Sequence, residues 1–126
     1  MKDTITVLVV EPKKAPYLKE IIPELNVLQD EVGGYIQVVY PWKEPVALIC
    51  DDDAKLKGKE LNRALRDEEG QIYDIVAGTF LLVGISEDDF TSLDSDLVHQ
   101  FTKMFELPEI FIRAEDKIMV IPMIEQ

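Results

Sequence analysis

The sequence predicts an α+β fold with a mixed, mainly antiparallel sheet of five or six strands, two main helices and one short helix. Short runs rich in β-branched residues follow one another in adjacent pairs, whereas a doubly wound parallel sheet would alternate each strand with a helix. Two other segments show apolar residues at helical spacing, with recognisable end signals. The chain has 126 residues, 47% of them hydrophobic, so residues 1–126 are expected to form a single domain.

The chain begins with a strand and a helix. Residues 4–10 are almost continuously apolar and β-branched, which predicts a central strand buried on both faces. Residues 17–22 fit neither a helix nor a strand clearly. The first main helix is expected to start at Pro23, because proline is tolerated at the first helical position, and to end at Gly33 as a left-handed cap.

Residues 35–66 are predicted to form a hairpin followed by a short helix. Residues 35–40 and 46–50 read as two strands joined by a five-residue loop with two prolines. Residues 60–66 are predicted to form the short helix, because Leu61 and Leu65 stand four positions apart.

The longest apolar run covers residues 72–85, and its β-branched and aromatic residues favour a strand over a helix. Gly78 interrupts this run, which predicts a bent central strand over residues 75–83. Two short strands, residues 110–112 and 118–121, are expected to close the chain as a hairpin. The second of them would leave an edge for pairing with another copy.

The second main helix is expected between the long apolar run and the terminal hairpin. Ser92 or Asp94 is predicted to cap it, and it should end near Phe105, shortly before Pro108. Its buried stripe is predicted to comprise Leu97, Val98, Phe101, Met104 and Phe105.

The charge is strongly negative, with 25 acidic and 13 basic residues and a net charge of −12. Such a surface repels phosphates, which argues against direct binding of DNA or RNA. Residues 76–126 hold ten of the acidic and only three of the basic residues. One acidic cluster is predicted to meet a basic surface of a partner protein, with simple solubility as the alternative; it comprises Glu87, Asp88, Asp89, Asp94 and Asp96.

The sequence offers little for catalysis. The one histidine, His99, is expected to face outward from its helix or to lie at the edge of the apolar stripe, and Cys50 is expected to be a small buried hydrophobe. Neither of the glycine-rich phosphate-binding motifs, G-x-x-x-x-G-K-S/T and G-x-G-x-x-G, is present. The acidic runs lack the residue spacing of a calcium-binding loop. We therefore expect a protein that is not an enzyme and binds no metal or cofactor. No segment resembles a membrane span or signal peptide, so the expected location is the cytoplasm.

A small-ligand site is predicted from two arginines and two aromatic residues, which stand out in this acidic chain. On a helix, Arg63 and Arg66 would share a face and clamp a phosphate or carboxylate, with Asn62 beside them. Tyr40 and Trp42 would supply a stacking surface. The alternatives are that the arginines pair with nearby acids, that Asn62 caps the helix, and that the aromatic loop is anchored on the core.

Three blocks of the sequence resemble one known family. They are Leu-Gln-Asp-Glu-Val-Gly-Gly-Tyr-Ile at residues 28–36, Leu-Asn-Arg-Ala-Leu at 61–65 and Asp-Ile-Val-Ala-Gly-Thr at 74–79. Together they are similar to the domain-of-unknown-function family 3846, over roughly residues 5–90. The family is found largely in phages and mobile elements of Firmicutes, and the resemblance implies such an origin but no established activity. The matching motif positions are Gly33, Gly34, Asn62, Arg63 and Gly78.

These observations lead to two functional hypotheses. The first is a non-enzymatic, acidic binding protein of phage or mobile-element type that engages a host protein with a basic surface in the bacterial cytoplasm, with a possible counter-defence role. The alternative is a binding module that captures a nucleotide-like small molecule.

Overall fold

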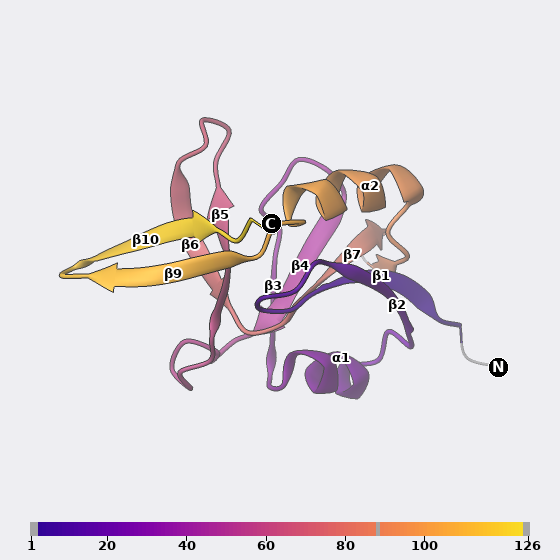
Figure 1. Ribbon diagram of the computed structural model, residues 1–126. Helices are drawn as coiled ribbons and strands as arrows, with labels where there is room; N and C mark the ends of the chain where they lie inside the picture. Colours follow the sequence, from indigo (N-terminus) through magenta and orange to yellow (C-terminus); the bar gives the residue numbers. More distant parts are fainter. Residues whose placement is uncertain (1–2, 88, 125–126) are drawn as a thin grey trace.

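A six-stranded antiparallel sheet forms the centre of the molecule (Figure 1). The computed structural model describes residues 3–87 and 89–124. The strands follow the order β2-β1-β7-β4-β3, and β8 pairs with β7. Every neighbouring pair is antiparallel, so the parallel component of the expected mixed sheet is not found in these ranges. The strands are β1 (Ile5–Val10), β2 (Tyr17–Ile21), β3 (Ile36–Val39), β4 (Val46–Asp51), β7 (Phe80–Ser86) and β8 (Asp89–Thr91).

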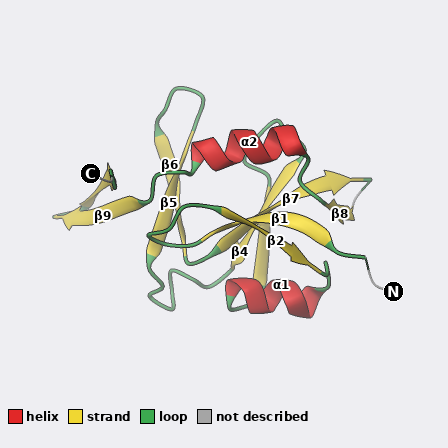
Figure 2. Ribbon diagram, turned by 45° about the vertical axis from the view of Figure 1, so that its right-hand side comes forward, coloured by secondary structure: helices red, strands yellow, loops and turns green. Residues whose placement is uncertain are grey.

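One helix covers each face of this sheet (Figure 2). Successive residues of β1 alternate between the two faces, so Val9 lies in the apolar cluster beneath α1 (Leu25–Val32) and Val10 in the cluster beneath α2 (Ser95–Met104). The strands β1, β7 and β4 are therefore buried on both sides, which explains their nearly continuous apolar sequences. The central strand expected for residues 4–10 is confirmed.

The main sheet has six strands, within the expected five or six, but two small antiparallel sheets lie beside it, so the described residues form ten strands in three sheets rather than one. The first joins β5 (Leu61–Arg66) to β6 (Ile72–Ala77). The second is the terminal hairpin of β9 (Glu109–Ala114) and β10 (Lys117–Pro122), which extends away from the body of the molecule (Figure 1). This hairpin confirms the prediction for the end of the chain. No helix in the described ranges has the length and apolar character that crossing a bilayer requires.

The predicted helix at residues 60–66 is wrong, because this segment is strand β5. Four-residue spacing of Leu61 and Leu65 fits a helix, but a partner strand is available immediately downstream, beyond a turn at residues 67–70. The side chain of Asp67 stabilises that turn by accepting the N–H groups of Glu69 and Gln71. Arg63 and Arg66 consequently do not share a helical face.

The single bent strand predicted for residues 75–83 is also wrong. Gly78 has a φ of +74°, and its N–H bonds to the carbonyl of Glu60. This left-handed residue ends the ladder of β6, and the chain enters the main sheet as β7 two residues later. One apolar run thus supplies strands to two different sheets.

The helix ends were predicted more accurately than the short elements. α1 begins at Leu25 with Glu24 as its N-cap, rather than at Pro23, whereas the left-handed cap at Gly33 is confirmed by a φ of +79°. Asp94 caps α2, since its side chain accepts the N–H of Leu97 at 3.0 Å. Met104 is exposed, so it does not belong to the predicted buried stripe.

Candidate functional site

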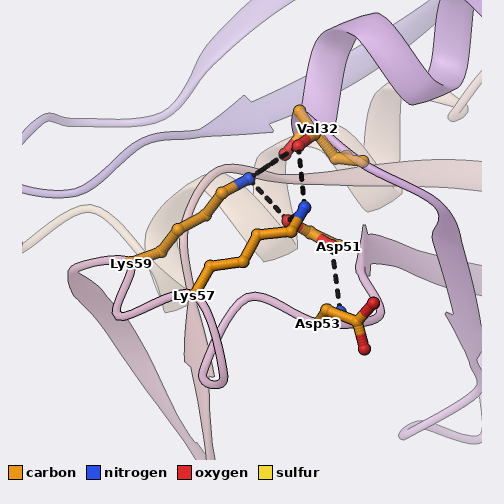
Figure 3. Close-up of polar contacts among 6 residues, drawn as sticks. Val32, Asp51, Asp53, Lys57 and Lys59 are labelled. Carbon is orange, nitrogen blue, oxygen red and sulfur yellow. Dashed lines mark hydrogen bonds and ion pairs between the residues drawn. The ribbon is translucent and has the colours of Figure 1, made fainter.

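A buried carboxylate, that of Asp51, lies where the first sequence block meets the loop after β4 (Figure 3). The apolar residues of β4 carry Asp51 into the interior, where it is only 4% exposed. The loop that follows β4 folds back and places two lysines beside Asp51. Their Nζ atoms lie 2.9 Å (Lys57) and 2.6 Å (Lys59) from Asp51 Oδ2. Asp51 Oδ1 accepts the N–H of Asp53 at 3.0 Å. The carboxylate is therefore fully engaged by its own chain.

The same two lysines bind the end of α1. Lys59 Nζ donates to the carbonyls of Val32 and Gly33 at 2.9 and 3.0 Å, and Lys57 Nζ donates to Gly33 at 3.3 Å. Cations are favourable here because the last carbonyls of a helix carry partial negative charge and lack partners within the helix. This Asp51–Lys57–Lys59 cluster joins β4, its loop and α1.

The charges of the cluster shift the acidity of its carboxyl group. Burial by itself raises the pKa of Asp51, because the charged form loses hydration. The hydrogen bonds from Lys59 and Lys57, together with the Asp53 N–H, outweigh this effect and hold the pKa of Asp51 well below its ordinary value. Asp51 is accordingly ionised at neutral pH.

Glycines allow the cluster to pack closely. A Cβ at Gly34 would lie 2.5 Å from both Asp51 Oδ1 and Lys57 Nζ. A Cβ at Gly78 would lie 3.1 Å from Cδ of Lys59, whose stem passes over this turn. The glycines of the first and third sequence blocks therefore border the cluster.

The second sequence block connects to the third through Asn62. Its Nδ2 donates to the carbonyls of Val10 and Gly78, both at 2.8 Å, and its Oδ1 accepts from Arg63. A register shift between Leu61 and Arg63 lets both Asn62 and Arg63 turn inward, although they are adjacent in the strand. All three blocks thus meet around the junction of the main sheet with the β5–β6 sheet.

Arg63 is a buried cation that is only 1% exposed. Its guanidinium donates to the carbonyl of Phe105 at 3.2 and 3.0 Å, to that of Lys14 at 2.6 Å, and to the backbone and side-chain oxygens of Asn62. Burial lowers the pKa of Arg63, and the negative charge of Glu109 partly opposes this. The arginine joins the end of α2 to β5 and the loop after β1.

The other residues predicted for ligand binding lie apart from this contact network. Arg66 is exposed and pairs with Glu109 at 2.8 Å. Arg63 and Arg66 line a pocket of about 210 Å³, but Tyr40 and Trp42 do not. Trp42 packs against the rings of Phe101 and Phe105, with centroids 4.6 and 6.1 Å away, which anchors its loop on the core. Tyr40 is 63% exposed.

The acidic cluster lies near the β7–β8 turn and the start of α2, away from the β9–β10 hairpin (Figure 2). Glu87, Asp89, Asp94 and Asp96 are exposed, whereas Asp88 lies outside the described residues. None of these four takes part in an ion pair of the described chain, while eight basic side chains elsewhere do. Their negative charge therefore faces solvent.

The two residues considered for catalysis, His99 and Cys50, lie in ordinary environments. His99 is exposed, as predicted. Cys50 is buried, and burial together with the nearby charges of Asp51 and Asp52 raises the pKa of its thiol. In residues 3–87 and 89–124, no three side chains of the kinds that bind metals are grouped.

Sequence reasoning missed the Asp51–Lys57–Lys59 cluster. From the sequence alone, residues 51–53 are expected to form a turn with solvated carboxylates, because three consecutive aspartates usually end a strand in solvent. The available signal was an aspartate directly after a fully apolar strand, followed by two lysines on either side of Gly58.

The model of one family, described as a domain of unknown function (DUF3846), matches residues 5–106. Neither the curated proteins nor the solved structures contain a match. Because the match covers most of the 126 residues, including Gly33, Gly34, Asn62, Arg63 and Gly78, the chain belongs to the DUF3846 family.

Proposed function

We propose that this protein is a non-enzymatic binding protein whose acidic end engages a basic surface of a partner protein. The acidic end comprises the exposed Glu87, Asp89, Asp94 and Asp96. The observation that carries the proposal is that these carboxylates form no ion pair with the rest of the described chain. Clustered like charges speed the encounter with an oppositely charged surface and disfavour acidic partners.

The interior supports a binding role rather than catalysis. Asp51, Asn62 and Arg63, the buried polar residues of the sequence blocks and their surroundings, are all bonded to other groups of the chain. A catalytic group needs a free position from which to reach a substrate. The proposal extends to a cytoplasmic host protein of a bacterium, met by a phage or mobile-element product in a counter-defence role.

Affinity capture from bacterial host lysate, read by mass spectrometry, tests the proposal. The test variant reverses Asp89 and Asp96 to lysine. The matched control reverses Asp30 and Glu69, which are also exposed and produce the same change in net charge. We expect the test variant to lose the captured partner and the control to retain it. Raising the salt from about 50 to about 500 mM should also weaken capture by the unaltered protein. Equal capture by both variants at low salt would contradict the proposal.

The second candidate is a module that binds a nucleotide-like small anion. A groove of about 540 Å³ favours it, because Lys55, Lys59 and Arg113 line this groove in a protein of net charge −12. Pockets that hold small molecules commonly have volumes of about 300 to 1,000 Å³.

A further inference from the structure

The groove lies among the loop after β4, strand β6 and the β9–β10 hairpin. It therefore lies between the two small sheets, outside the main core. Its walls include Lys55, Tyr73, Asp74, Arg113 and Ile118. None of these residues was predicted to bind a ligand, because they come from three segments far apart in the sequence.

The basic side chains of the groove differ in whether they already pair with a carboxylate of the same chain. Lys59 is committed to Asp51 at 2.6 Å, and Lys55 pairs with Asp74 at 2.9 Å. The side chain of Arg113 has no hydrogen bond or ion pair to any residue in the described ranges. An arginine without a carboxylate partner can offer a planar set of donors to a phosphate or carboxylate group.

The remaining walls are apolar or aromatic. Tyr73 is 55% exposed, although it lies in a strand, and its neighbour Ile72 is exposed as well. Ile118, the cross-strand partner of Arg113, contributes apolar surface from the hairpin. An exposed aromatic ring beside apolar side chains suits a flat aromatic group, which can stack on the ring while its edge stays solvated.

We infer that this groove binds a planar aromatic ring carrying a phosphate or carboxylate group, at the size of a mononucleotide. Arg113 holds the anionic group, and the ring lies against Tyr73. The inference rests on the second candidate function and names the site and ligand class for it. It places the ligand away from Arg63 and Arg66, whose guanidinium groups are occupied by carbonyls and by Glu109.

Titration calorimetry of the full chain at low salt tests the inference with adenosine monophosphate as the probe. Adenosine supplies the ring without the charge, and inorganic phosphate supplies the charge without the ring. We expect each of these halves to bind at least about tenfold more weakly than the whole probe. Benzoate, used in parallel, distinguishes a site for aromatic carboxylates from one for phosphates.

Variants of the protein test whether the probe binds in this groove. Arg113→Gln and Tyr73→Ala should each weaken binding of the tighter probe by about tenfold. Lys117→Gln is the control, because Lys117 lies on the same hairpin but does not line the groove, and it should bind as the unaltered protein does. If a probe binds equally well to all three variants, the groove assignment is wrong while a small-ligand function stands. If neither adenosine monophosphate nor benzoate binds, both the assignment and the second candidate function are wrong.

Discussion

The carboxylate of Asp51 and the ammonium of Lys59 lie 2.6 Å apart, and the side chain of Asp51 is 1% exposed. This pair joins the last residue of β4 to a loop that also holds the end of α1. Removing one member of a buried ion pair leaves the other charge without compensation, which is costly. The Asp51–Lys57–Lys59 cluster is therefore expected to be important for stability.

Replacing Lys59 by methionine should lower the free energy of unfolding by about 3 kcal/mol, because Asp51 then keeps Lys57 as its one charged partner and the Val32 carbonyl loses a donor. Urea denaturation measures the change. Lys13→Met is the matched control, since Lys13 pairs with Glu60 at 3.0 Å on the surface. That change should cost less than about 1 kcal/mol. Similar losses in the two variants would show that the Lys59 contact contributes no more than a surface pair.

The lowered pKa of Asp51 predicts a specific response to acid. A carboxyl group with a depressed pKa in the folded state stabilises the fold fully above its unfolded pKa of about 3.9. The contribution is lost as the pH falls below that value toward the folded pKa. Asp51→Asn lacks this group, so its stability deficit relative to the unaltered protein should shrink between about pH 6 and about pH 3. A deficit that stays constant over this range in urea titrations would argue against the assignment.

Gly34→Ala should destabilise the fold although Gly34 has an ordinary backbone conformation, because the added methyl would lie 2.5 Å from the Asp51 carboxylate. We expect a loss of about 2 kcal/mol, as for other overpacked sites. The same substitution in an Asp51→Ala background should cost distinctly less, since the obstructing carboxylate is gone and Lys57, which it holds, can then move aside. Thermal or urea denaturation of the four proteins in this cycle gives the coupling. Strict additivity would mean that the strain arises elsewhere.

Asn62→Ala should cost about 3 kcal/mol, because the buried carbonyls of Val10 and Gly78 both lose a donor. The exposed Asn26 of α1 provides the control. Asn26→Ala should change stability by less than about 0.5 kcal/mol or improve it, because alanine favours a helix. Comparable effects at the two sites would contradict the bridging role of Asn62.

Tyr17 should titrate unusually late. A hydrogen bond from its hydroxyl to Glu11, together with partial burial, raises the pKa of Tyr17 to about 12. The ultraviolet difference between the unaltered protein and Tyr17→Phe should therefore show a phenol ionising at about pH 12 rather than about pH 10. Glu11→Gln should move this ionisation to lower pH, because the acceptor loses its charge. An unchanged midpoint in that variant would exclude Glu11 as the cause.

The candidate site shows how far sequence reasoning reaches. The three sequence blocks pointed to Gly33, Gly34, Asn62, Arg63 and Gly78, and these residues do meet or border one junction. Their roles were not predicted, because a helix at residues 60–66 would place Arg63 on a surface. In the fold, the neighbouring strand β6 and the register shift turn Arg63 into the interior.

The sequence by itself determined the α+β class, the buried central strand at its start, the end of the first helix at Gly33 and the terminal hairpin, and it narrowed the start of the second helix to Ser92 or Asp94. These features depend on short-range patterns of apolar residues, caps and turns. Only the tertiary structure decided that Leu61–Arg66 is a strand, that Gly78 separates two sheets and that Asp51 lies buried between two lysines. Each of these outcomes depends on a partner strand or on charged groups from another part of the chain, which local propensity does not specify.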